Sequence, residues 1–171
     1  MAFSPTEIRE ALERLVDELI ERGVSARITI VGGAAMTLVY APRASTRDVD
    51  ATYRPVDEVE AAGAAVGERF GYPPGWINNE VAQFSPPGGE LEPAILIERD
   101  GVTVCVAGPR HMLAMKLRAA RGRRDETDIE ALLDRCGIRT LAAAEGLFEE
   151  YYPDTELSEL AVAVVRRHVE T

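Results

Sequence analysis

The chain has 171 residues, of which 46% are hydrophobic, so it can bury one substantial core but is too short for two full domains. Its formal net charge of −10 at pH 7 argues against broad, nonspecific nucleic-acid binding, which needs many Lys and Arg side chains facing phosphates. No apolar run approaches the roughly twenty residues of a membrane span, so we expect a cytoplasmic protein without a membrane partner.

The first half of the chain is predicted to alternate helices with strands. The letters SPTE at residues 4–7 form a capping box with proline at the first helical position, and apolar residues then recur at helical spacing until Gly23. The β-branched run at residues 27–31 ends at Gly32-Gly33, which predicts a strand followed by a glycine turn. Further on we expect a short helix at 34–40, a strand at 48–53 and an alanine-rich helix at 57–70.

The second half is predicted to contain one hairpin followed only by helices. Asp100-Gly101 separates two apolar runs, at residues 94–98 and 102–106, and an Asp-Gly pair in that position favours a hairpin. Trp76 lies in a loop-rich stretch before the hairpin, and we interpret it as a packing anchor. The later helices are expected at residues 109–120, 125–136, 140–151 and 156–168.

These elements predict a single domain over residues 1–171, of the α/β (α+β) class. Residues 1–108 would form an α/β core in which a small mixed sheet of about four to five strands has flanking helices. Residues 109–171 would form a helical subregion packed on that core. The two cysteines, Cys105 and Cys136, have no His or Cys neighbour at zinc-ligand spacing, and we interpret them as buried thiols.

Two short motifs carry the candidate chemistry, the glycine pair Gly32-Gly33 and the acidic pair Asp48 and Asp50. Side chains alternate along a strand, so two carboxylates separated by one residue point to the same face and can grip one metal ion. Magnesium is commonly held by one or two carboxylates together with substrate phosphates. Glycines let the backbone approach a triphosphate closely. Either motif alone also fits a turn beside a solvated strand, but their conjunction predicts an NTP and metal site.

Three segments of the chain resemble a known family. Residues 31–55, VGGAAMTLVYAPRASTRDVDATYRP, are similar to the signature of polymerase-β-like minimal nucleotidyltransferases: a hydrophobic strand, Gly-Gly or Gly-Ser, a spacer and Asp-x-Asp. The segments PPGWINNEV and HMLAMKLRAARGRRDETDIEALL resemble a narrower group, the AbiEii-like and MenT-like toxin nucleotidyltransferases. In that group a lysine-bearing helix precedes Arg-Asp-x-x-Asp-Ile. The resemblance implies a nucleotidyltransferase fold.

The resemblance also implies a reaction and its partners. A hydroxyl of an RNA such as the tRNA acceptor end, or of a protein, would attack the α-phosphate of an NTP, and pyrophosphate would leave. The metal ion would be Mg²⁺ or Mn²⁺, and a toxin of this group would have a cognate antitoxin protein as partner. The residues expected to take part in catalysis are Asp48, Asp50, Lys116 and Asp128. Asp48 and Asp50 would also bind the metal ion. The residues expected to bind the NTP are Gly32, Gly33, Arg47, Lys116 and Arg124.

Two departures from the family pattern leave other functions open. Gly33 stands where the superfamily often has Ser, so one phosphate hydrogen bond must come from elsewhere. The run at 102–106 lacks the third metal-binding carboxylate that many members carry. One alternative is therefore a binding module that keeps the NTP pocket, has lost transfer and acts through a protein partner. Another is an aminoglycoside-type adenylyltransferase of small molecules, which shares the same metal clamp.

The downstream charged residues have structural explanations as well. The Lys and Arg residues between 110 and 124 are typical of a phosphate-rich partner, but basic residues at a helix C-terminus also suit the helix dipole. We interpret Asp125 as the N-cap of the helix that follows. Asp128 fits a functional and a structural role equally well.

Overall fold

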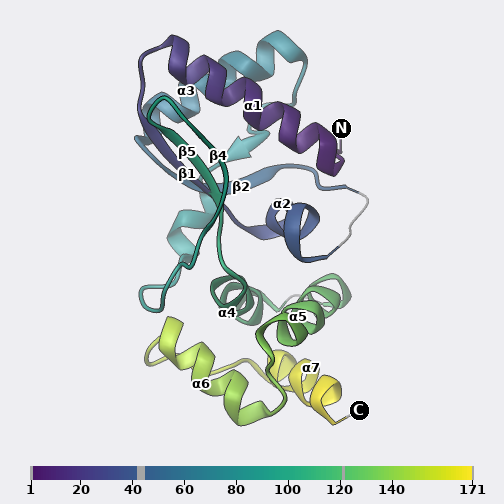
Figure 1. The fold of residues 1–171 in the computed structure, drawn as a ribbon. Coiled ribbons are helices and arrows are strands. Elements are labelled where there is room, and N and C mark those ends of the chain that lie inside the picture. Colours follow the sequence, from purple (N-terminus) through teal and green to yellow (C-terminus); the bar gives the residue numbers. More distant parts are fainter. Residues whose placement is uncertain (1, 42–44, 121, 171) are drawn as a thin grey trace. The chain divides into compact units, whose positions relative to one another are not determined.

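The structure is a computed structural model that describes residues 2–41, 45–120 and 122–170. It forms two compact units: a sheet unit of residues 1–83 and 93–107, and a helical unit of residues 84–92 and 108–171. Across the described ranges there are one five-stranded mixed sheet and seven α-helices, which confirms the α/β (α+β) class (Figure 1). No helix in the described part of the chain combines the length and apolarity that a membrane crossing demands.

The sheet has the strand order β3-β2-β1-β5-β4. Its central strand, β1, pairs antiparallel with β2 and parallel with β5. β4 and β5 form the hairpin expected around Asp100-Gly101, and β3 is a two-residue strand, parallel to β2, in the stretch expected to be loop. The strands are β1 (Ala26–Ile30), β2 (Val49–Arg54), β3 (Ile77–Asn78), β4 (Ala94–Arg99) and β5 (Val102–Val106).

One face of the sheet is covered by helices α1 (Pro5–Glu21) and α3 (Val56–Phe70), which pack on each other and on the strands. Ile28 of β1, its antiparallel neighbour Tyr53 and its parallel neighbour Val104 are all buried. Because side chains alternate along a strand, these three residues share the face toward the helices. The core of the sheet unit therefore lies on this face.

Trp76 ties α3 to the β3 edge of the sheet. Its side chain is buried and its indole N–H donates to the Gly63 carbonyl at 2.8 Å, which confirms the expected packing role. The helix can approach this closely because Gly63 and Gly67 have no side chains. A Cβ atom at Gly63 would stand 2.8 Å from Ile77 Cγ2, and one at Gly67 would stand 3.2 Å from Trp76 Cδ1.

The helical unit contains α4 (Pro109–Ala119), α5 (Arg123–Cys136), α6 (Leu141–Tyr151) and α7 (Glu159–Val169). The segment 84–92 belongs to it: Gly88 donates its N–H to the Tyr151 carbonyl at 3.1 Å, and the Tyr151 hydroxyl donates to the Glu90 carbonyl at 2.6 Å.

Three helices of this unit begin elsewhere than expected, although α6 differs by only one residue because Thr140 is its N-cap. α7 begins at Glu159 because the Ser158 hydroxyl accepts a hydrogen bond from the Ala161 N–H and so caps the helix. α5 has Gly122 as its N-cap, so the expectation that Asp125 caps this helix is wrong. Asp125 lies in the first turn instead, where its charge still suits the helix dipole.

Gly63 provides a test of the close packing of α3. An Ala in place of a helix-interior Gly ordinarily stabilises by about 0.5–1 kcal/mol. In Gly63→Ala the added methyl would meet Ile77 at 2.8 Å inside the core, so we expect the free energy of unfolding to fall by about 1–3 kcal/mol. Urea denaturation followed by circular dichroism measures the change.

The matched control is Gly146→Ala in α6, because nothing lies within 4 Å of a Cβ atom added there. This variant should gain the ordinary helical stabilisation. A similar gain in Gly63→Ala would show that α3 does not pack as closely on β3 as described.

Candidate functional site

The glycine turn follows β1 directly. Val31 donates its backbone N–H to the Asp50 carbonyl at 3.0 Å and is the N-cap of α2 (Gly32–Ala35), which continues as a π-helix at Met36–Tyr40. The expected strand followed by a short helix is confirmed, but the helix begins at Gly32 and not at Ala34, so the glycine pair forms its first turn. Gly32 has a φ of +62°, a left-handed conformation that glycine adopts without steric cost.

The Asp50 carboxylate lies against the backbone of this turn. A Cβ atom at Gly32 would stand 2.6 Å from Asp50 Oδ2, closer than real Cβ atoms approach an oxygen. Asp50 follows the buried Val49 at the start of β2 and precedes the buried Ala51. Its side chain therefore points to the sheet face opposite α1 and α3, beside Gly32.

Asp48 lies one residue before β2, because the strand begins at Val49 and not at Asp48 as expected. Asp48 and Asp50 are both partly exposed, and Arg47 is exposed. The Asp48 carbonyl accepts a hydrogen bond from Thr46 Oγ1 at 3.2 Å. The structure thus places both aspartates at the same end of β2.

Thr46 is a residue of this site that the sequence did not reveal. It is buried, and its backbone exchanges two hydrogen bonds with Phe3, at 2.6 and 2.9 Å. A Cβ atom at Gly33 would stand 2.9 Å from Thr46 Oγ1. The threonine hydroxyl therefore lies where a side chain on residue 33 would otherwise project. The sequence offered one signal for Thr46, a hydroxyl-bearing residue two positions before Asp48. Many loops contain such a residue, so this signal was not specific.

The strand β5 supplies no acid to this face of the sheet. Its residues Thr103 and Cys105 point to the same side as Asp50, and Cys105 Sγ lies 3.3 Å from Thr29 Oγ1 of β1. Cys105 is buried, as expected, whereas Cys136 is only partly buried. Burial raises the pKa of the Cys136 thiol to about 11, so this thiol is protonated at neutral pH and a poor nucleophile.

Lys116 and Asp128 meet in the helical unit as a bridge between α4 and α5. Lys116 Nζ lies 2.8 Å from Asp128 Oδ2 and 3.0 Å from Asp125 Oδ1. The Asp128 side chain is fully buried, and that of Lys116 is 13% exposed. Because a buried charge is costly without an opposite charge beside it, this cluster fixes the first turns of α5 against α4.

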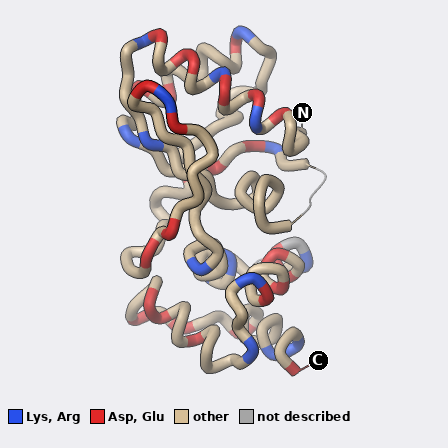
Figure 2. Tube along the Cα trace, viewed as in Figure 1, with Lys and Arg blue, Asp and Glu red and all other residues tan. Residues whose placement is uncertain are grey.

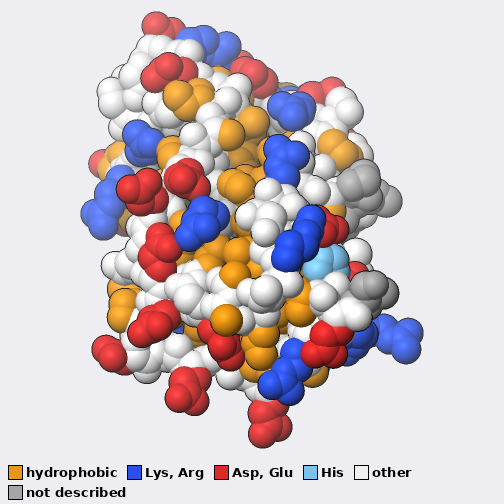
Figure 3. Space-filling model, turned by 60° about the horizontal axis from the view of Figure 1, so that its bottom comes forward, with side chains coloured by type: hydrophobic (Ala, Val, Ile, Leu, Met, Phe, Trp, Pro, Cys, Tyr) orange, Lys and Arg blue, Asp and Glu red, His pale blue; other side chains and the backbone are white. Residues whose placement is uncertain are grey.

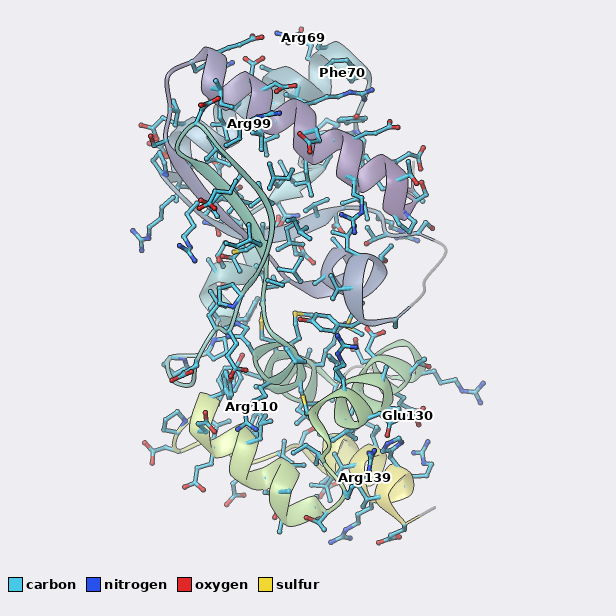
Figure 4. All side chains as sticks on the ribbon, in the orientation of Figure 1. Arg69, Phe70, Arg99, Arg110, Glu130 and Arg139 are labelled. Atoms are coloured by element: carbon cyan, nitrogen blue, oxygen red, sulfur yellow. The ribbon has the colours of Figure 1, made fainter. Side chains whose placement is uncertain are left out.

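The remaining basic residues around α4 are partly engaged inside the helical unit. Arg110, labelled in Figure 4, reaches Glu150 of α6 at 2.8 Å. The Arg118 guanidinium lies 5.0 Å from the centroid of the Tyr152 ring. The Arg124 side chain lies outside the described residues. Lys and Arg occur in both units (Figure 2), and on the face in Figure 3 the described ones are interspersed with Asp and Glu. That face presents no broad basic surface.

The expected site residues therefore divide between the two units. The sheet unit holds Gly32, Gly33, Arg47, Asp48 and Asp50, and the helical unit holds Lys116, Arg124 and Asp128. Within the sheet unit, the turn and the acidic strand are in contact. Within the helical unit, Lys116 and Asp128 are in contact.

Comparisons with known proteins found no match: no family model fits the chain, and no curated protein or solved structure is significantly similar to it.

Gly32 provides a test of the contact with Asp50. In Gly32→Ala a left-handed Ala would cost about 1–2 kcal/mol, and its methyl would also collide with the carboxylate. Gly71→Ala is the matched control, because Gly71 has a φ of +74° with nothing within 4 Å of an added Cβ atom. We expect the larger loss of unfolding free energy, measured by urea denaturation, in Gly32→Ala.

The same contact predicts coupling between the two positions. Asp50→Ala should restore part of the stability lost in Gly32→Ala, because it removes the colliding oxygen. Additive effects in the double variant would contradict the contact.

Lys116 is expected to be required for stability. Lys116→Met removes the partner of a fully buried carboxylate, so the free energy of unfolding should fall by about 3 kcal/mol. Arg118→Met, at an exposed position of the same helix, should cost less than about 1 kcal/mol. Thermal and urea unfolding measure both. If the stability of Lys116→Met were unchanged, the ion pairs of Lys116 would not stabilise the fold, and a role of this lysine in ligand binding would be favoured.

Proposed function

We propose that the chain is a metal-dependent nucleotidyltransferase that moves a nucleoside monophosphate from an NTP to an acceptor hydroxyl. The observation that carries this proposal is the contact of the Asp50 carboxylate with the Gly32 backbone. It brings a glycine turn, whose backbone can approach a triphosphate closely, beside a carboxylate able to hold the metal ion that accompanies it. The nucleotidyltransferase fold belongs to the same proposal.

Asp48 and Asp50 would hold Mg²⁺ or Mn²⁺. No group of three or more His, Cys, Asp or Glu side chains that could hold a metal ion occurs among the described residues. Two carboxylates with the remaining positions filled by water and phosphate oxygens are a common arrangement for Mg²⁺, so the donor set fits the ion. When bound, the ion neutralises charge on the phosphates and on the leaving pyrophosphate.

The chain's own residues would bind and orient the nucleotide. The backbone at Gly32 and Gly33 would face the triphosphate, and the Thr46 hydroxyl beside Gly33 would replace the Ser that is often found in the superfamily that residues 31–55 resemble. In the transfer the acceptor oxygen forms a bond to the α-phosphorus, the bond from the α-phosphorus to the bridging oxygen breaks, and the hydroxyl proton is released. Catalysis then rests mainly on positioning and charge neutralisation.

Lys116 and Asp128 have a structural role in this proposal, unlike Asp48 and Asp50. Both ion pairs of Lys116 favour a structural role, since a side chain that holds a buried carboxylate is costly to redirect toward phosphate. We therefore assign the transfer chemistry to the sheet unit. Phosphate binding by Lys116 and Arg124, and a catalytic role of Asp128, remain predictions.

A second candidate function is nucleotide binding without transfer. The observation that favours it is β5, which carries Thr103 and Cys105 and no acid on the sheet face of Asp50, whereas many members of the superfamily that the sequence resembles carry a third metal-binding carboxylate on such a strand. In this case the protein would act through a partner protein. Mn²⁺ binding, measured by electron paramagnetic resonance with and without NTP, detects an intact site whether or not transfer occurs.

The test of the proposed reaction is label transfer. The protein is incubated with each α-labelled NTP, Mg²⁺ and, separately, total tRNA, a protein lysate or an aminoglycoside. We expect labelling of one acceptor class, lowered roughly 100-fold or more in Asp48→Ala plus Asp50→Ala, because the site loses its metal ligands. The control is Asp57→Ala plus Glu58→Ala, which removes two acids from the start of α3 instead.

Each outcome decides between the two candidates. Label transfer that survives loss of both aspartates would place the chemistry elsewhere. Mn²⁺ and NTP binding that needs Asp50, without transfer to any acceptor, would establish the binding module. Growth arrest on expression, abolished by the double aspartate variant and relieved by a neighbouring gene, would support the toxin with its antitoxin.

A further inference from the structure

The sheet unit contains a second candidate site, away from the glycine turn. An open cleft of about 720 Å³ lies between α3 and the segment that carries β3, residues 72–80. Ligand pockets in proteins typically measure about 300–1,000 Å³. The cleft is therefore large enough for a small organic molecule.

One face of α3 forms a wall of this cleft. The lining residues of α3 are Glu60, Gly63, Ala64, Gly67 and Glu68, which recur at the three- and four-residue spacing of a single helix face. Such a face usually packs apolar side chains. Here small residues occupy its centre, and a glutamate stands near each end.

Aromatic side chains contribute to the opposite wall and the base. Tyr53, Tyr72 and Trp76 all line the cleft, and the rings of Tyr72 and Trp76 meet edge to face with centroids 5.2 Å apart. Trp76 is fixed in place by its hydrogen bond to the Gly63 carbonyl. Aromatic faces attract cations as well as apolar groups.

All the charged side chains of the described residues that line the cleft are acidic. Glu60, Glu68 and Glu80 line the cleft, and no Lys, Arg or His is among the described residues that do. In the described structure none of these three glutamates forms an ion pair with Lys or Arg. Glu60 is instead 3.5 Å from the Tyr53 hydroxyl, whose pKa is raised by burial and by the Glu60 charge. Carboxylates around a partly enclosed cavity raise the local concentration of cations.

An acceptor without a donor lies in the same lining. The Oδ1 atom of Asn79 is buried and has no hydrogen-bond partner among the described residues. A buried acceptor of this kind is costly, and an N–H donor from a bound molecule would satisfy it. Because Asn79 Oδ1 is enclosed by protein atoms, a bound N–H donor would reach it only after a rotation of the Asn79 side chain toward the cleft.

We propose that this cleft binds a small organic cation, an amine or guanidinium carried on an apolar body. The charged group would lie among the glutamates, and the apolar body would lie against the partly exposed Tyr72 ring and the exposed Ala64 of α3, above the buried Trp76. The proposal stands independently of nucleotidyl transfer. The two sites nevertheless meet at the sheet edge, because Asn78 of the cleft is the register partner of Asp50.

The chain contains a reporter for this binding. Trp76 is its single tryptophan and lines the cleft, so a ligand there should change the fluorescence of the folded protein. The probes are spermidine and agmatine, titrated at constant ionic strength. Hexylamine and hexanol form a matched pair that differs in charge but not in length. We expect the three amines, and not hexanol, to change Trp76 emission and the amide NMR signals of residues 60–80.

The matched variants remove charge without changing shape. Glu60→Gln plus Glu68→Gln should weaken spermidine binding about tenfold, as expected for the loss of two exposed ion pairs. Glu21→Gln plus Glu58→Gln removes two exposed glutamates that do not line the cleft, and should leave the affinity unchanged. Both pairs lie on the surface, so circular dichroism should show the native fold.

Three results would overturn the proposal. The first is an absence of any change in Trp76 emission and in the cleft amide signals at millimolar spermidine and agmatine. The second is equal binding of hexanol and hexylamine, which would show that the charge plays no part. The third is equal loss of affinity in the two variant pairs, which would show a general effect of net charge. None of these results bears on label transfer from NTP, so the two proposals fail separately.

Discussion

The left-handed turn at Gly32 holds the end of β1 directly against the Asp50 carboxylate of β2. Its φ of +62° and the 2.6 Å approach of Asp50 Oδ2 to the Cβ position leave no space for a side chain. The hydrogen bond from Val31 to the Asp50 carbonyl then locks the end of β1 to the start of β2. A carboxylate is thereby held beside backbone that carries no side chain, which is the arrangement on which the proposed metal and phosphate site rests.

The two faces of the sheet carry different kinds of side chain. The face that carries Ile28 and Val104 packs against α1 and α3, whereas the opposite face carries Asp50, Thr29 and Cys105. Thr29 and Cys105 are buried on that face as well, and their side chains lie 3.3 Å apart, within hydrogen-bonding distance. At the β3 edge of the sheet, Asn78 of the cleft pairs in register with Asp50, so the acidic cleft adjoins the strand of the proposed metal site.

In the helical unit, two basic residues that the sequence associated with phosphate binding form ion pairs that hold the helices together. Lys116, the residue that most resembles a phosphate contact, holds the buried Asp128 across two helices, and Arg110 is bound to Glu150. A cluster of basic residues therefore indicates a phosphate-rich partner only when its members are not already paired. The basic cluster here is at least partly structural.

The sequence alone determined the elements whose signals are local. The capping box began α1 as expected, the Asp-Gly pair made the hairpin of β4 and β5, and the glycine pair ended β1 in a turn. It also indicated that Gly32-Gly33 and Asp50 belong together. The sequence missed the two-residue strand β3 and misassigned the cap of α5, because both depend on neighbours and not on a local pattern.

Only the tertiary structure decided which residues touch. The contact of Asp50 with Gly32, the Thr46 hydroxyl beside Gly33, the pairing of Lys116 with Asp128 and the cleft beside α3 all join segments that are separate in the chain. Strand register and helix packing set these contacts, and both are fixed by the whole core rather than by any local pattern.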